Sequence, residues 1–259
     1  MQSPPLPRWV DEPGAALPEP GAVLLSCFPS AGLAATVAGH YIVGALGLPR
    51  IGIFELPEIP PVAIVQSGQV QPPIRVYGRK DLAVVLSEFP PPLGVVGELS
   101  RAILDGAESR RVRLVLGLEG VVPQPLGSDE GDAEESVWAV LARRDPALMR
   151  TFQAAGTRAL EDGVIGGLSG ALLVGAIRRT IPVAVSLVSA RAAEGYPDHR
   201  AAAVLIEALD RLLPELSIDT RPLRSQAESI EKALRESMAR RPKPAATETP
   251  AEPEPAMYQ

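Results

Sequence analysis

Residues 22–48 contain no aspartate, glutamate, lysine or arginine, so this part of the chain has to be buried in a protein core or in a membrane. A membrane-spanning helix needs about 20 consecutive apolar residues, whereas Pro29 and four glycines interrupt this run. We therefore predict a buried strand over residues 22–28 and a buried helix over residues 33–46. The residues around Cys27 are similar to a lipoprotein cleavage site, but no basic segment with a long apolar segment precedes them, so we expect a cytoplasmic protein.

The rest of the chain alternates between short apolar runs and longer amphipathic runs. Strands are predicted over residues 50–56, 62–66, 74–78, 82–89, 111–118 and 137–142, and helices over residues 93–110 and 225–241. Residues 182–188, PVAVSLV, are typical of a parallel strand that is covered on both faces. A further helix is predicted to begin near Asp198, because aspartate often caps helix N-termini. This alternation predicts an α/β fold, a doubly wound three-layer sandwich with a mostly parallel central sheet.

The two ends of the chain differ from the part between them. Residues 1–20 are rich in proline, and we expect them to be a flexible segment. After Arg241 the apolar periodicity stops and five prolines follow, so residues 241–259 are predicted to form an extended, disordered tail. One domain over residues 21–240, which ends in the helix over residues 225–241, accounts for the rest.

Charge and composition exclude some classes of function. The formal net charge is −6, whereas a nucleic-acid-binding surface needs clustered lysine and arginine, so we expect no nucleic-acid partner. A single cysteine excludes an internal disulfide framework and is typical of a reducing compartment. The interrupted apolar run described above also leads us to expect no membrane partner.

Few side chains are available for catalysis or metal binding. His40 and His199 are the only histidines, and Cys27 is the only thiol. We expect His40 to be a core or interface residue and His199 to be a solvated residue in the first turn of a helix. The acidic residues within 128–135 lack the spacing of a calcium-binding loop. We therefore predict no metal, no cofactor and no enzyme activity.

The glycine-rich stretch GVIGGLSG, residues 163–170, precedes an apolar helix. Gly166, Gly167, Ser169 and Gly170 allow two interpretations: backbone N–H groups that bind an anion at the helix N-terminus, or a tight turn that only glycine permits. The spacing is neither a dinucleotide fingerprint nor a phosphate loop. Ser169 also lacks the closing glycine of an esterase nucleophile turn.

Three longer stretches resemble one family. Residues 27–47, 163–188 and 195–219 resemble the PAC2 family of proteasome assembly chaperone homologues, particularly its archaeal members. The resemblance covers residues 20–236 and is most specific at Gly166, Gly167 and Gly170, and at the Gly-Tyr-Pro-Asp sequence that ends at Asp198. It implies a fold similar to purine nucleoside phosphorylases without their catalytic residues, and a role in holding proteasome subunits.

The chain departs from the family pattern in two places. Cys27 and Ser30 stand where the family often has glycines, and Ser189, Ala190 and Arg191 replace an acidic residue and a threonine.

The last three residues carry the most specific functional prediction. Met257, Tyr258 and Gln259 fit the hydrophobic-Tyr-any-residue ending of proteasome activators and of some archaeal PAC2-like chaperones, which binds between neighbouring α subunits of the core particle. Given the composition of this chain, such an ending arises by chance with a probability of about 0.7%.

These observations predict an assembly chaperone-like protein whose partners are proteasome core-particle α subunits. The resemblance also implies a homo-oligomer, or an assembly with a paralogue. Two alternatives remain: a proteasome activator or adaptor that uses the same tail, and a small-molecule binder or enzyme that uses Gly166, Gly167 and Ser169.

Overall fold

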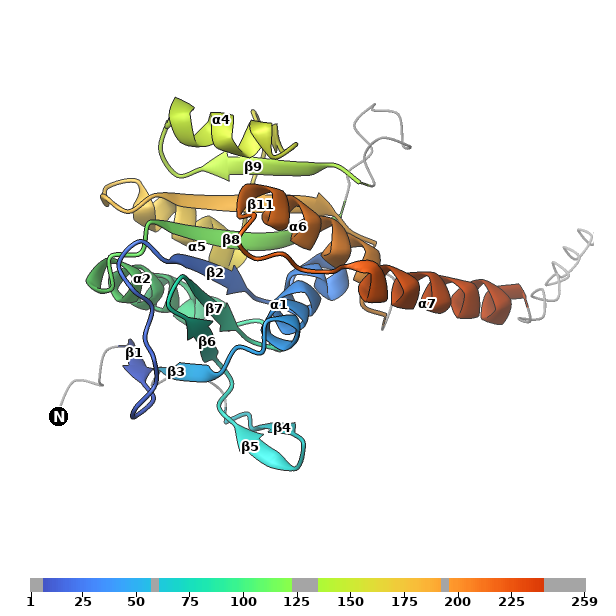
Figure 1. Ribbon diagram of the computed structural model, residues 1–259, viewed down its shortest axis with the longest axis horizontal. Helices are drawn as coiled ribbons and strands as arrows, with labels where there is room; N and C mark the ends of the chain where they lie inside the picture. The colour runs from blue at the N-terminus through green and yellow to red at the C-terminus, as the bar shows by residue number, and fades with distance from the viewer. Residues whose placement is uncertain (1–6, 57–60, 123–134, 192–195, 240–259) are drawn as a thin grey trace, which may run out of the picture.

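The computed structural model describes residues 7–56, 61–122, 135–191 and 196–239 of the chain (Figure 1). Within these residues, nine strands form one mixed sheet in the order β1-β3-β6-β7-β2-β8-β11-β9-β10. The strands are β1 (Arg8–Asp11), β2 (Val23–Cys27), β3 (Arg50–Glu55), β6 (Arg75–Arg79), β7 (Leu82–Leu86), β8 (Leu114–Val121), β9 (Val137–Leu141), β10 (Arg158–Ala159) and β11 (Val183–Ser189). The helices are η1 (Ala31–Leu33), α1 (Ala34–Ala45), α2 (Leu93–Ser109), α4 (Pro146–Ala154), α5 (Gly167–Ala176), α6 (His199–Leu212) and α7 (Arg221–Ala239).

Four parallel strands, β7, β2, β8 and β11, form the centre of the sheet. Leu25 of β2 lies opposite Val84 of β7 on one side and Leu116 of β8 on the other. Every residue of β2 is buried, as expected for a strand that is covered on both faces. Because these strands are parallel, their carboxyl ends meet at one edge of the sheet, where ligand sites of α/β proteins usually lie. The outer pairings are antiparallel, except that of β9 with β10.

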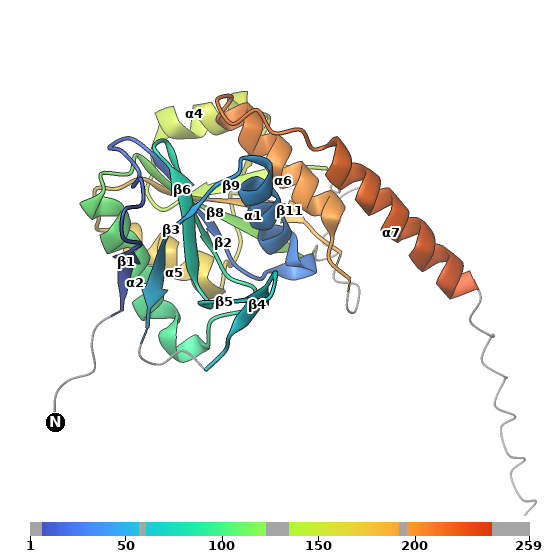
Figure 2. The ribbon, with the colours of Figure 1, turned by 60° about the horizontal axis from the view of Figure 1, so that its bottom comes forward.

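Helices cover both faces of the sheet and make the predicted three-layer sandwich (Figure 2). Side chains of α1, α4 and α6 pack in one core cluster with Leu25 and Leu116. Side chains of α2 and α5 pack in a second cluster with Leu24 and Val115, which point to the opposite face. The α/β fold class predicted from the sequence is therefore confirmed.

Part of the proline-rich N-terminal segment is ordered in the sheet. Strand β1 pairs with β3, and the indole of Trp9 is buried where these strands meet α2. A Cβ added at Gly106 of α2 lies only 2.9 Å from the Trp9 ring, and the Arg110 guanidinium lies 4.0 Å from the ring centroid. The expected flexibility of residues 1–20 therefore does not extend to residues 8–11.

The strand predicted over residues 62–66 lies outside the main sheet. It forms β4 (Ile64–Gln66), which pairs only with β5 (Gln69–Gln71) among the described strands. The turn between them has positive φ at Ser67 and Gly68. This hairpin projects from the body of the molecule below β3 in Figure 1.

Helix α7 begins at Arg221, four residues before the predicted start. Leu223 and Ala227 are buried in its first half, whereas the second half extends beyond the body (Figures 1 and 2). The side chains of Leu234 and Met238 are outside the described part of the structure, and so are residues 240–259. Among the described helices, none has the length and apolarity needed to cross a bilayer.

Candidate functional site

The carboxyl ends of the central strands hold the residues that could form a ligand site in this fold. The loops that follow β2 and β11 contact each other there. The N–H of Asp198, in the loop after β11, donates to the Gly32 carbonyl, in the loop after β2, at 2.7 Å. The Ser30 hydroxyl ties the latter loop to β8 as well, because it accepts a hydrogen bond from the N–H of Gly120 at 2.9 Å. Gly32 has a φ of 59°, and an added Cβ lies 2.8 Å from the Cβ of Asp198. The loops that would border a ligand are therefore joined directly to each other.

Asp198 holds this junction together. Its carboxylate accepts a hydrogen bond from the N–H of Ala201 at 2.9 Å, which caps α6 as the sequence predicted. The other carboxylate oxygen accepts from the N–H of Arg191 at 2.8 Å. His199 follows the cap, and its Nδ1 lies 3.1 Å from the Pro197 carbonyl oxygen.

Two of the glycines in the first turn of α5 are required by the backbone. Gly166 is the N-cap residue, and Gly167 has a φ of 59°. A Cβ added at Gly170 collides with the carbonyl oxygen of Ile165. The tight-turn interpretation therefore explains Gly167 and Gly170, and the anion-binding interpretation stays a prediction.

Ser169 points inward to a carboxyl group. Its hydroxyl donates a hydrogen bond to Glu119 Oε2 at 2.6 Å. Burial raises the pKa of Glu119 to about 7, because removing the carboxylate from water outweighs the hydrogen bond from Ser169. A nucleophilic serine needs an adjacent base that is oriented by a third group, and neither His40 nor His199 has a hydrogen bond to Ser169 in the described structure.

An ion-pair cluster around one buried arginine lies at the end of β7. The guanidinium of Arg75, which has no solvent exposure, pairs with Glu88 and donates to the Tyr77 hydroxyl and the Pro72 carbonyl, both at 2.9 Å. His40 Nε2 lies 2.9 Å from the same carboxylate. Burial opposes ionisation of Glu88, but hydrogen bonds from His40 and Arg75 outweigh it and lower its pKa to about 2. The cluster joins α1 to β6 and β7. His40 is half exposed, so it is not a core residue, and its place in an interface stays a prediction.

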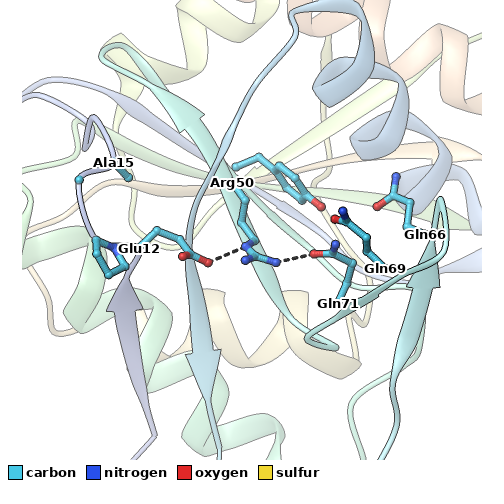
Figure 3. A pocket seen from close by; sticks show the side chains of 9 residues that line it. Glu12, Ala15, Arg50, Gln66, Gln69 and Gln71 are labelled. Atoms are coloured by element: carbon cyan, nitrogen blue, oxygen red, sulfur yellow. Dashed lines mark hydrogen bonds and ion pairs between the residues drawn. The ribbon is translucent and has the colours of Figure 1, made fainter.

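A cavity of about 500 Å³ lies between the hairpin and the body (Figure 3). Arg50 lies in the middle of the cavity wall. Its Nε donates a hydrogen bond to the Glu12 carboxylate at 2.6 Å, and its terminal Nη1 donates to the side-chain oxygen of Gln71. Gln66 and Gln69 of the hairpin complete a polar lining. Small-molecule pockets are mostly apolar, and the charge of Arg50 is already neutralised by Glu12, so this cavity does not indicate a particular ligand.

The base of α7 is attached by ion pairs. Arg224 contacts Glu207 of α6 at 2.7 Å and Glu135 at 3.3 Å, and Arg200 contacts Glu135 at 3.2 Å. The Glu207 carboxylate also accepts a hydrogen bond from the Thr220 hydroxyl at 2.8 Å. These contacts raise the pKa of Arg224 and fix the direction in which α7 leaves the body.

Of the remaining candidate residues, Cys27 is buried and the others lie outside the described part of the structure. Cys27 is buried in β2, and burial raises the pKa of its thiol to about 12, so it has no thiolate reactivity. The described residues contain no cluster of histidine, cysteine and carboxylate side chains that could hold a metal ion. Met257, Tyr258 and Gln259, and residues 128–134 of the predicted acidic loop, lie outside the described residues.

Comparison with known proteins gives consistent matches along most of the chain. The model of the PAC2 family matches residues 24–238. An uncharacterized protein of Methanocaldococcus jannaschii, MJ0106, is 26% identical over 214 residues, which cover 83% of this chain and 84% of that protein. The crystal structure of Pyrococcus furiosus PbaA, described as an archaeal homolog of proteasome-assembly chaperone, superposes with a TM-score of 0.78 at 25% identity, covering 91% of this chain and 92% of PbaA. That of Pyrococcus furiosus PbaB, described as an archaeal proteasome activator, gives a TM-score of 0.73 at 18% identity, covering 90% of this chain and 99% of PbaB.

Proposed function

This chain belongs to the PAC2 family, as the resemblance of its motifs predicted, and we propose that it is a proteasome assembly chaperone-like protein. In this proposal it binds core-particle α subunits, and residues 257–259 bind between neighbouring α subunits. The observation that carries the proposal is the Met-Tyr-Gln ending on a chain whose body shares 25% identity and its fold with PbaA.

The chemistry of the ending suits a pocket between two subunits. The terminal carboxylate can pair with a lysine, the Tyr258 ring can be buried while its hydroxyl keeps a hydrogen bond, and Met257 can fill an irregular apolar space. The direction of α7, which extends from the body, supports presentation of the residues that follow it (Figure 2). At about 3.1 Å per residue, the residues after Ala239 are enough to reach on the order of 60 Å.

A proteasome activator is the second candidate. The fold shared with PbaB favours it, since that protein is described as an activator. A small-molecule enzyme is less well supported, because the Ser169 hydroxyl is bonded to Glu119 and the loops at the carboxyl edge are bonded to each other.

We also propose that the protein acts in the cytoplasm and as a homo-oligomer, so that several tails can bind one ring.

Pull-downs with purified α subunits and with assembled core particles test the proposal. An assembly chaperone is expected to capture free α subunits, whereas an activator is expected to prefer assembled particles and to increase their peptide hydrolysis. Both activities should fall strongly when residues 257–259 are removed. Binding to neither species by the full chain would exclude both candidates.

A further inference from the structure

A cavity of about 340 Å³ lies where β9 ends and β11 begins. The N–H of Ala142, just after β9, donates a hydrogen bond to the carbonyl of Val183, the first residue of β11, at 2.9 Å. Strand β11 is parallel to β8, so its first residue lies at the amino edge of the central strands. The cavity is therefore at the opposite edge from the loops that contain Gly32 and Asp198, where a ligand of an α/β protein is usually found.

The inner wall of the cavity is apolar. It is formed by Leu141 at the end of β9, by Val183, and by Leu148 of α4, which lies beside β9 (Figure 1). Val183 is buried, and the two leucines are half-buried and pack against the core. The volume is at the lower end of the range for small-molecule pockets, which extends from about 300 to 1,000 Å³. Such a wall suits a short aliphatic group.

The mouth of the cavity carries an excess of positive charge. Arg143, Arg144 and Asp145 all line it and are exposed. Arg143 Nη2 donates a hydrogen bond to the Thr180 carbonyl at 2.9 Å, a neutral partner that leaves its charge uncompensated. Arg144 has no hydrogen bond or ion pair within the described residues. The Asp145 carboxylate accepts two N–H groups of the first turn of α4, both at 3.0 Å, and forms an ion pair with neither arginine.

We propose that this cavity binds a carboxylate that is carried next to a short aliphatic group, as in the C-terminal residue of a polypeptide or in a small branched-chain acid. In this site, Arg144 binds the carboxylate, because a guanidinium can donate two parallel hydrogen bonds to it. Arg143, which is held by Thr180, adds a second positive charge at the mouth. The aliphatic group packs against Leu141 and Leu148. The site does not depend on the proposed proteasome-binding tail.

Matched ligands test the need for the carboxylate. In saturation-transfer difference NMR with the full chain, N-acetyl-leucine is expected to bind at least about tenfold more tightly than N-acetyl-leucinamide, which has the same aliphatic group and no charge. If the wild-type chain bound neither compound at millimolar concentration, or bound both equally, the proposal would be wrong.

An acetylated tetrapeptide that ends in leucine separates the two sources of the ligand. Tighter binding of the peptide than of N-acetyl-leucine identifies a polypeptide end, and equal or weaker binding identifies a small acid. Either result supports the site, provided that Arg144→Ala weakens binding of the compound that binds more tightly.

Substitutions of exposed arginines test the location of the site. Arg144→Ala should weaken binding of N-acetyl-leucine at least about tenfold, without a change in circular dichroism or melting temperature. Arg144→Glu should reverse the preference, so that leucinamide, which carries a positive amino group, binds more tightly than N-acetyl-leucine. Arg150→Ala is the matched control, because Arg150 is an exposed arginine of α4 that does not line the cavity.

Two results with these variants would overturn the proposal: wild-type affinity in Arg144→Ala, or an equal loss in Arg150→Ala. Deletion of residues 257–259 should leave binding of N-acetyl-leucine unchanged, which separates this result from failure of the proposed function.

Discussion

The hydroxyl of Ser169 donates a 2.6 Å hydrogen bond to the carboxyl group of Glu119, and this pair links the N-terminus of α5 to the end of β8. The two residues are 50 positions apart in the chain. The pair lies near the carboxyl ends of the central parallel strands, where ligand sites of α/β proteins usually lie. A buried carboxyl group whose pKa is about 7 carries part of a negative charge at neutral pH, which disfavours an anion at this helix N-terminus.

Glu119 should make the stability of the protein depend on pH. Its pKa rises from 4.5 to about 7 on folding, so between these values the folded chain binds more protons than the unfolded chain. Stability is therefore expected to fall as the pH rises from about 4.5 to 7, by up to roughly 3 kcal/mol. Urea unfolding at a series of pH values measures this slope.

Glu119→Gln should remove most of that slope, because the amide does not ionise. The variant is expected to gain stability relative to wild type at pH 8 and to gain little at pH 4.5. Glu228→Gln on the exposed side of α7 is the matched control and should keep the wild-type slope. Equal slopes in the wild type and in Glu119→Gln would show that Glu119 is ionised without penalty in the folded protein.

Arg75 and Arg79 provide a matched pair of arginines on one strand. Arg75 is fully buried and pairs with Glu88, whereas Arg79 pairs with Asp81 at the surface. Arg75→Ala removes a fully buried guanidinium and leaves the partly buried carboxylate of Glu88 with His40 as its remaining partner, so it should lower the free energy of unfolding by about 2 to 3 kcal/mol. Arg79→Ala should change it by about 1 kcal/mol or less. Chemical denaturation of both variants checks the difference, and similar losses would contradict the buried location of Arg75.

Trp9 should contribute strongly to stability although it lies in a segment rich in proline. Trp9→Ala removes a buried indole that packs against Gly106, Phe54 and the Arg110 guanidinium. We expect a loss of about 3 to 5 kcal/mol in chemical denaturation. Leu93→Ala, at an exposed position of α2, should change stability by less than about 0.5 kcal/mol. If the two losses were alike, β1 would not be a stable part of the sheet.

Local sequence patterns predicted the central elements of the fold correctly. Strands β2 and β11, helix α1 and the Asp198 cap of α6 follow from apolar runs and from a capping residue, which are properties of neighbouring residues. Strand pairing could not be predicted in this way, because the periodicity of one strand does not indicate which other strand lies beside it. The strand over residues 62–66 was found by its pattern, but its partner is the three-residue strand β5 rather than the main sheet.

The features that sequence reasoning missed depend on contacts between distant segments. Trp9 is buried because β3 and α2 supply glycines at the right places. Arg75 is buried because Glu88 and Tyr77 satisfy its guanidinium. Nothing in the local sequence distinguishes Arg75 from an exposed strand arginine, and Glu119 has no nearby residue that indicates its bond to Ser169.

The tail should contribute nothing to folding. Residues 242–259 have five prolines and no apolar periodicity, so they offer no surface that could pack on the body. Their deletion is expected to leave the melting temperature nearly unchanged in differential scanning calorimetry. Removal of residues 222–241 as well should lower it, because Leu223 and Ala227 are buried. A drop of many degrees on deletion of residues 242–259 alone would mean that the tail packs on the domain.

The terminal carboxylate distinguishes a specific binding motif from a tail that is merely adhesive. Tyr258→Ala should weaken binding to proteasome α rings strongly while leaving the fold and the oligomer intact, because the ring would be the main buried group of the motif. One alanine added after Gln259 should be nearly as damaging, since it moves the carboxylate away from its lysine and keeps the tyrosine available. Each tail is expected to bind modestly, because ordering a flexible segment opposes binding, and several tails on one oligomer multiply the loss when all are changed. Pull-downs at matched salt compare these chains with wild type and with Thr247→Ala, a control within the tail. If the extended chain bound as well as wild type, the carboxylate would have no role, and the docking mechanism would be wrong even though the chain belongs to the PAC2 family.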